Sequence, residues 1–334
     1  MALIGKLATS VAIGAAIFGC LALGLVASER PIPDLRADGD GLNFDVLAGS
    51  DVASPNSAVP LQRYSARDGA DLGFRRWESG REDLPLIVAV HGSGWHGQQF
   101  STLGAALARQ GLGDVIAPDL RGHGPNPERR GDVDYIGQFE DDLADLIAQQ
   151  VRPGQRVVML GHSSGGGLVI RFAGGAHGDL LSGAVLLAPF VQHDAPTMRT
   201  GSGGWARVMT RRIIGLSMLN MVGITGLNHL PILQFRFPST VLDGPLGDTA
   251  TRAYSFRLNA SYAPRRDWQS DIAALPDFLL LVGDHDEAFV ADAFEPAFSD
   301  ITQRGRYGQI SSGHLDLVDH PETLRLIGDY MAGL

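Results

Sequence analysis

One turn constrains this chain more than any other stretch, the sequence G-H-S-S-G at residues 161–165. An apolar run at residues 157–160 precedes the turn, and small and apolar residues at 165–170 follow it. This order predicts a strand, a tight turn and a helix. A serine at such a turn has a strained backbone, and glycines flank it because the neighbouring chain passes too close for side chains. We therefore predict that Ser163 is a nucleophile held above a sheet edge, where the positive end of the helix favours an oxyanion.

The composition is that of a globular protein, with 44% hydrophobic and 19% charged residues among 334. This length suits one large domain with an insertion, or two domains. The formal net charge of −10 argues against nucleic acid as a partner, because phosphate binding needs clustered cations. The single cysteine, Cys20, excludes an intrachain disulfide and a cysteine-based metal site. We expect no metal site.

The N-terminal segment at residues 7–27 is uncharged and almost entirely apolar or small. At about 1.5 Å per residue, a helix of this length can cross a hydrocarbon core of about 30 Å. The run is longer than the apolar part of a signal peptide, which has about 7–15 residues. We therefore favour a single-pass membrane anchor with the catalytic domain on the non-cytoplasmic side. A signal peptide cut near Ala27 or Ser28, giving a secreted or periplasmic protein, is the alternative. Lipidation of Cys20 is a weaker one, because the bulky Phe18 precedes it.

Apolar runs that indicate buried strands alternate with helical patterns along the rest of the chain; they lie at residues 86–90, 115–117, 157–160, 184–188 and 278–282. Unbroken apolar runs are typical of parallel strands covered on both faces. The alternation predicts an α/β fold with a doubly wound, mostly parallel sheet.

The domain boundaries follow from changes in this pattern. Residues 29–60, rich in Asp, Gly, Ser and Pro, read as a linker, and residues 61–334 as the catalytic domain. An Asp-Gly pair at residues 68–69 between two alternating runs predicts a hairpin. The regular alternation stops at about residues 191–275, which we interpret as a cap of short helices over the carboxyl ends of the strands.

The loop after the first buried strand reads H-G-S-G at residues 91–94. We predict that the backbone amides of Ser93 and Ser164 stabilise an oxyanion, and that His91 fixes the loop. Trp95 and Phe100 are candidate substrate-binding residues, with packing as the alternative for both.

The acid and the base come from the last two strand ends. Asp286 follows the strand at 278–282, and we prefer it to Asp284, which lies close enough to the strand end to cap the turn. His314 follows the final strand on a glycine-containing loop, whereas His320 precedes a proline and suits the start of the last helix. The chain order is then serine, aspartate, histidine.

Other polar residues are interpreted as structural. Asp119 and His123 lie on the loop of a different strand. Asp141, Asp142 and Asp145 belong to an amphipathic helix, where they indicate a solvated face and not a metal site.

Together these segments resemble the α/β-hydrolase superfamily, and within it the monoacylglycerol lipase/lysophospholipase-like branch of serine aminopeptidase S33 type. The resemblance covers residues 61–333 and is carried by HGSG at 91–94, PDLRGHG at 118–124, GHSSGG at 161–166, GDHD at 283–286 and GH at 313–314. It implies ester hydrolysis by a Ser-His-Asp triad without a cofactor, and it supports Asp286 through the family's G-x-x-D pattern. Two departures weaken a lipase assignment: Ser164 stands where lipases of this branch often have Met, and the insertion does not match the lipase cap.

The leading hypothesis is thus a serine hydrolase that cleaves carboxylic esters through an acyl-enzyme. Small-molecule or lipid esters are the expected substrates, with monoacylglycerols and lysophospholipids as candidates, and the N-terminal segment is the expected contact with the membrane. An amidase or peptidase with the same triad is one alternative. A non-catalytic binding module with a hydrolase fold is the other.

Overall fold

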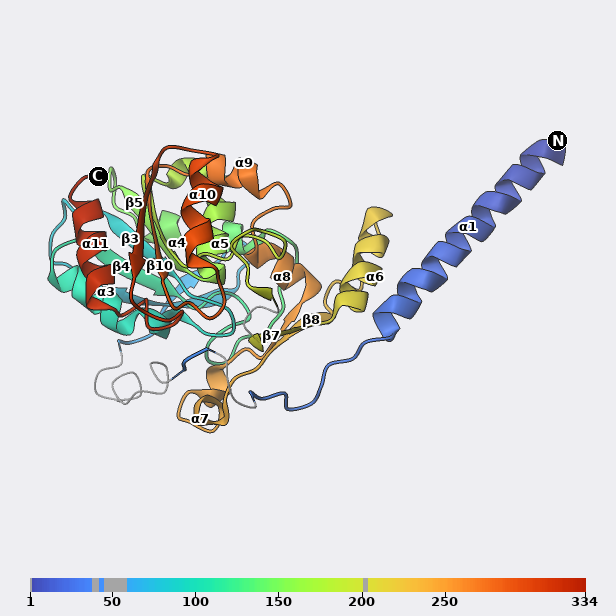
Figure 1. The fold of residues 1–334 in the computed structure, drawn as a ribbon, viewed down its shortest axis with the longest axis horizontal. Helices are drawn as coiled ribbons and strands as arrows, with labels where there is room; N and C mark the ends of the chain where they lie inside the picture. The colour runs from blue at the N-terminus through green and yellow to red at the C-terminus, as the bar shows by residue number, and fades with distance from the viewer. Residues whose placement is uncertain (1, 38–41, 45–58, 201–203) are drawn as a thin grey trace.

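The computed structural model describes residues 2–37, 42–44, 59–200 and 204–334. It consists of an α/β body from which one long N-terminal helix projects (Figure 1).

The body is built on an eight-stranded sheet in the order β1-β2-β4-β3-β5-β6-β10-β11. The strands are β1 (Gln62–Ser65), β2 (Asp71–Trp77), β3 (Leu86–Val90), β4 (Asp114–Pro118), β5 (Val157–His162), β6 (Gly183–Leu187), β10 (Phe278–Gly283) and β11 (Gly305–Ile310). β1 and β2 form the predicted antiparallel hairpin, β2 also pairs antiparallel with β4, and all remaining pairs are parallel. The predicted α/β fold with a mostly parallel sheet is confirmed.

Helices cover both faces of this sheet. α3 (Ser101–Arg109) packs with α11 (Pro321–Met331) on one side, and α4 (Gln138–Gln150) packs with α5 (Ser164–Ala173) on the other (Figure 1). α10 (Phe294–Ser299) lies against β11. Short 3-10 helices complete the body at η1 (Gly97–Phe100), η2 (Gly178–Leu180) and η5 (Ala291–Ala293).

The acidic face of α4 differs from the expectation at one position. Asp142 is 2% exposed, and its two carboxylate oxygens accept hydrogen bonds of 2.8 and 2.9 Å from the Arg121 guanidinium. The reason is angular: Asp142 lies about 60° around the helix from the buried Phe139, at the edge of the apolar stripe. Asp141 and Asp145 point further outward and pair with Arg67.

The insertion contains helices, as expected, and also a second sheet that the sequence pattern did not predict. Its elements are β7 (Ala206–Val208), α6 (Thr210–Met221), β8 (Pro231–Phe235), α7 (Ser239–Leu242), η4 (Gly247–Thr249), β9 (Ala253–Ser255), α8 (Phe256–Tyr262) and α9 (Trp268–Ala273). β7, β8 and β9 form an antiparallel sheet in that order. The prediction of short helices alone was therefore incomplete, because residues 206–208 form β7 and α6 begins only at Thr210.

The N-terminal helix α1 (Ala2–Ala27) is long and apolar enough over Thr9–Ala27 to cross a membrane, and 11% of that window is buried. It is therefore not a core helix. Most of the predicted linker, residues 38–41 and 45–58, lies outside the described residues. Residues 29–37 run beside the cap, where Ile32 exchanges two backbone hydrogen bonds of 2.8 Å with the side chain of Gln234.

Candidate active site

Ser163 lies at the turn between β5 and α5 with φ 55° and ψ −122°. A positive φ is energetically unfavourable for any residue that has a side chain, so the backbone is strained at this position. The flanking glycines are required by close approach of the backbone. A Cβ at Gly161 would lie 2.4 Å from the Gly165 carbonyl oxygen, and one at Gly165 would lie 2.1 Å from that of Val90. The structure thus has the strained strand-to-helix turn that the sequence predicted.

Asp286 and His314 come together from the ends of β10 and β11. His314 Nδ1 lies 2.7 Å from Asp286 Oδ2, and both residues are buried. Asp286 Oδ1 accepts two further hydrogen bonds of 2.8 Å, from the amides of Ala288 and Phe289. Burial acts to raise the pKa of Asp286, but the charge and hydrogen bond of His314 and the two amides outweigh it, so the pKa lies below its ordinary value. An ionised Asp286 fixes the proton of His314 on Nδ1 and leaves Nε2 as a proton acceptor.

The two alternative residues lie elsewhere. Asp284 is exposed, and its carboxylate contacts the ring of the adjacent His285. His320 caps the N-terminus of α11, where its Nδ1 accepts a hydrogen bond of 3.2 Å from the Glu322 amide. The structure therefore brings Asp286, and not Asp284, to His314.

Ser163 and His314 line the same cavity, of about 20 Å³. Ser93 and Trp95 line it as well, together with aromatic side chains of the cap, Trp205 and Phe237. The other predicted substrate-binding residue is different: Phe100 is fully buried in the core and is not part of the cavity wall, so packing describes it better.

The loop that carries Ser93 is held from both sides. The Gly92 amide donates to Gln99 Oε1 at 2.9 Å, and the Gly94 amide donates to the Tyr254 hydroxyl at 2.6 Å. The hydroxyl groups of Ser93 and Ser164 lie 2.6 Å apart, which ties this loop to the turn of Ser163. With its two neighbours engaged, the Ser93 amide is the candidate donor of this loop.

Tyr254 comes from cap strand β9, and sequence reasoning did not single it out. Its hydroxyl also lies 2.7 Å from Nε2 of His123, whose Nδ1 donates to the Arg121 carbonyl at 3.0 Å. Burial lowers the pKa of His123 to about 4, so the ring is neutral and Nε2 accepts the tyrosine proton. The hydroxyl oxygen of Tyr254 is then free to accept the hydrogen bond from the Gly94 amide.

The remaining predicted structural residues hold this edge of the sheet. His91 Nε2 accepts a hydrogen bond of 3.2 Å from the Leu120 amide, as expected of a loop-fixing residue. Asp119 forms a buried ion pair of 2.6 Å with Arg75.

His162, next to the nucleophile position, was not predicted to have a role. Its Nε2 donates to the His314 carbonyl at 3.0 Å and its Nδ1 accepts from the Gln99 amide group at 2.8 Å. Burial lowers the pKa of His162 to about 3, which keeps the ring neutral.

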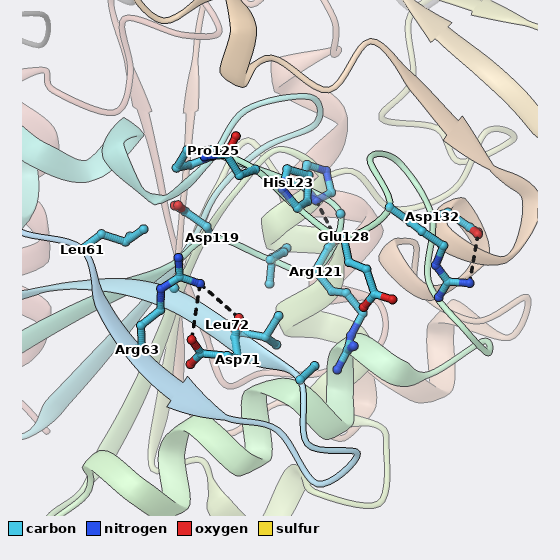
Figure 2. Close-up of a pocket in the computed structure, with 17 residues that line it drawn as sticks. Leu61, Arg63, Asp71, Leu72, Asp119, Arg121, His123, Pro125, Glu128 and Asp132 are labelled. Atoms are coloured by element: carbon cyan, nitrogen blue, oxygen red, sulfur yellow. Dashed lines mark hydrogen bonds and ion pairs between the residues drawn. The ribbon is translucent and has the colours of Figure 1, made fainter.

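A larger cavity, of about 120 Å³, lies between the β1–β2 hairpin and the loop at residues 119–132 (Figure 2). Its wall combines charged residues with apolar ones such as Leu61 and Leu72, and the Arg63 guanidinium donates to the Asp71 carbonyl there at 3.1 Å. Ser163, Asp286 and His314 are not part of this wall. Across the described ranges, no three His, Cys, Asp or Glu side chains gather as they would around a metal ion.

Known proteins resemble this chain over part of its length. The family model for serine aminopeptidase S33 matches residues 82–241. Human monoglyceride lipase is 30% identical over 156 residues, which are 46% of this chain and 49% of that enzyme. The matched stretches span only about a third to a half, 31 to 49%, of the lengths of the curated relatives.

Solved structures show the same fold at low identity. A soluble variant of monoglyceride lipase from Saccharomyces cerevisiae has a TM-score of 0.60 at 16% identity, covering 83% of this chain and 94% of its own. A membrane phospholipase A described as a bacterial virulence factor has a TM-score of 0.55 at 16% identity, covering 99% of this chain and 98% of its own. Its aligned region therefore includes α1. The strand order and these structures show an α/β-hydrolase fold, and in sequence the chain is similar to serine aminopeptidase S33 proteins and to monoglyceride lipase.

Proposed function

We propose that this protein is a serine hydrolase that cleaves carboxylic esters, with Ser163, His314 and Asp286 as its triad. The observation that carries the proposal is the buried 2.7 Å contact between His314 Nδ1 and Asp286 Oδ2, beside a cavity that Ser163 and His314 share. A neutral imidazole oriented by a carboxylate is the base that a serine hydroxyl needs for attack at neutral pH.

The reaction proceeds in two steps. His314 Nε2 takes the proton of Ser163 Oγ as the oxygen attacks the ester carbonyl, and then gives that proton to the departing alcohol. Water attacks the resulting acyl-enzyme by the same route, which releases the acid and restores the serine. The Ser93 and Ser164 amides stabilise the oxyanion in both steps, an effect worth about 3–4 kcal/mol per donor.

The proposed substrates are lipid esters such as monoacylglycerols or lysophospholipids. Two observations support this class: the aromatic cap residues Trp205 and Phe237 in the cavity wall, and the apolar helix α1 on the same chain. The named activities of similar proteins, a monoglyceride lipase and a membrane phospholipase A, agree with it.

We further propose that α1 is retained as a membrane anchor with the catalytic domain on the non-cytoplasmic side. Ala22 and Val26 of α1 share a buried apolar cluster with Leu216, Leu219 and Ile232 of the cap. Cleavage near Ala27 would expose the cap side of that cluster to water. The intact mass of the protein recovered from membranes tests this: a chain that begins near residue 28 contradicts retention.

The triad is tested by labelling the full chain with a fluorophosphonate probe, beside the variants Ser163→Ala and Ser299→Ala. We expect labelling of the parent and of Ser299→Ala, which alters a serine on α10, and none of Ser163→Ala. A folded parent that does not label would favour a non-catalytic binding module. Comparing an acyl ester with the matching anilide separates an esterase from an amidase, and acyl esters of increasing chain length test the lipid assignment.

A further inference from the structure

The cap contains a long uncharged stretch that ends in an exposed apolar tip. Between Arg212 and Arg236 the sequence has no Asp, Glu, Lys or Arg. The tip comprises the end of α6 and the loop that follows, where Met221 is 82% exposed, Val222 57% and Ile224 52%. Contiguous exposed apolar side chains of this kind mark a surface that contacts something other than water.

The tip is carried by a helix that packs directly on α1. A Cβ at Gly215 of α6 would lie 2.5 Å from the Ala22 carbonyl oxygen and 2.8 Å from a methyl group of Val26. This glycine therefore permits the close approach of the two helices. The pair rises from the cap on the side of the molecule towards which α1 projects (Figure 1).

Arg212 joins the N-terminal end of α6 to the C-terminal end of α1 by hydrogen bonds. Its guanidinium, in a residue 6% exposed, donates to the Val26 carbonyl at 3.2 Å, to the Pro231 carbonyl at 2.9 Å and to the Glu29 carbonyl. The Arg212 amide also donates to the Glu29 carboxylate at 3.1 Å. A cation at the C-terminal end of α1 satisfies carbonyl groups and complements the helix dipole. The arrangement fixes the orientation of α6 relative to α1.

The direction of α6 sets the depth of its tip. Arg212 lies at the Val26 end of α1 and Gly215 lies beside Ala22, so α6 runs antiparallel to α1. From residue 212 to residue 221 the helix rises about 13 Å, at about 1.5 Å per residue. This rise brings Met221 to about the level of residue 18 of α1, inside the apolar window Thr9–Ala27.

Two amide side chains near the tip are paired with each other. The amide groups of Asn220 and Asn228 exchange two hydrogen bonds of 2.7 and 2.8 Å. Asn220 also donates to the Leu216 carbonyl at 2.7 Å. Internal pairing is what a hydrocarbon environment requires, because water is not available there to satisfy such groups.

We propose that α6 and the loop at residues 221–226 are embedded in the lipid leaflet nearest the catalytic domain, beside α1. The occupant of the apolar surface is the acyl region of a bilayer, because the surface continues the exposed apolar face of α1 at the same depth. This inference rests on the proposed retention of α1 as a membrane anchor, and it holds whether or not Ser163 is a catalytic nucleophile.

Single cysteines labelled with an environment-sensitive fluorophore test the proposal. In a full-length Cys20→Ala background, Met221→Cys and Ile224→Cys would be compared with Leu180→Cys, all in phosphatidylcholine vesicles. Leu180 is an exposed apolar residue, 43% exposed, that precedes β6 and so lies at the opposite end of the strands from the cap. Each variant would be quenched by iodide in the buffer and by spin labels on the lipid acyl chains.

We expect blue-shifted emission at positions 221 and 224, with strong quenching by the acyl-chain spin labels and little by iodide, and the reverse at position 180. Iodide quenching at 221 and 224 as strong as at 180 would overturn the proposal. Shielding of the tip from both quenchers would also overturn it, since a protein would then cover the tip. Because the readout is fluorescence, loss of hydrolase activity would not affect it.

Discussion

The loops around Ser163 and the cap are held by different forces. Around Ser163 the chain is positioned by backbone contacts that only glycine permits and by hydrogen bonds among buried polar side chains. The cap and α1 are joined mainly by apolar packing, with Arg212 as the main polar lock at their base. Directional bonds suit a site whose donors must lie within fractions of an ångström. Apolar packing suits a surface for which we propose a fluid membrane as the partner.

The largest expected effect comes from a substitution that disturbs only the loops around Ser163. Asp286→Asn keeps the shape of the side chain but removes the charge that orients His314, so we expect kcat to fall about 10⁴-fold. Hydrolysis of a short soluble ester measures it. Asp284→Asn is the control, because Asp284 is exposed and does not contact His314, and it should leave kcat within about twofold. Equal losses in both variants would contradict the assignment of Asp286.

The next largest effect comes from a substitution at the contact between the cap and α1. Arg212→Leu removes the three hydrogen bonds that the buried guanidinium donates to backbone carbonyls and leaves those carbonyl groups without a donor, so we expect the free energy of unfolding to fall by about 3 kcal/mol. Arg211→Leu is the matched control, since Arg211 is exposed and its contact with Glu29 is 3.7 Å long; such a pair contributes about 0–1 kcal/mol. Denaturation in detergent micelles measures both.

The kcat of Arg212→Leu for a short ester should stay near that of the parent. A fall in kcat as large as that of Asp286→Asn would show that the two regions are not separable.

The free energy of unfolding should depend on pH through the buried neutral histidines near Ser163, which the contact between the cap and α1 does not contain among the described residues. Burial lowers the pKa of His123 from 6.5 to about 4 in the folded protein. Between these two pH values the unfolded chain binds a proton on His123 more readily than the folded protein does. The contribution of the neutral His123 to the free energy of unfolding is therefore fully present above pH 6.5 and is lost as the pH falls towards 4. From pH 7 to pH 5 this single group should cost about 2 kcal/mol. Urea denaturation at the two pH values should show a smaller difference for His123→Gln; an unchanged difference would contradict the shift.

The smallest effect tests the hydrogen bond that joins the two regions. Tyr254→Phe removes the acceptor of the Gly94 amide, so the Ser93 amide should be less well positioned and kcat should fall about tenfold with KM nearly unchanged. Tyr330→Phe is the control: it removes a buried hydroxyl that bonds the Asp277 carbonyl, away from the cavity. A rise in KM without a fall in kcat would contradict a positioning role for Tyr254.

The sequence could predict the features that follow from local patterns, and it missed those that depend on contacts between distant segments. The parallel strands, the hairpin and the turn at Ser163 follow from local patterns, because unbroken apolar runs and flanking glycines have few other uses. The approach of Asp286 to His314 follows from their order after adjacent strands, while their catalytic role stays a prediction. The buried position of Asp142 was missed because the cation that pairs with it comes from Arg121, on a distant loop.

The cap was the least predictable part. Its strands β7 to β9 are three to five residues long, too short for an alternating pattern to stand out from helical spacing. Tyr254 and Gln99 belong to no motif, and their importance arises only from where the fold places them. The packing of α6 on α1 depends on Gly215, which in the sequence is one glycine among 43.

The hydrogen bond from Gly94 to Tyr254 has a consequence for any attempt to re-engineer this protein. The loop at residues 91–94, which we propose to stabilise the oxyanion, belongs to the α/β body, yet the side chain that supports it comes from the cap. A chimera that replaces the cap to change substrate preference would therefore also remove a support of the reaction centre. The transferable module is the cap together with the loop at residues 91–94, and a donor cap should provide a hydroxyl at the position of Tyr254.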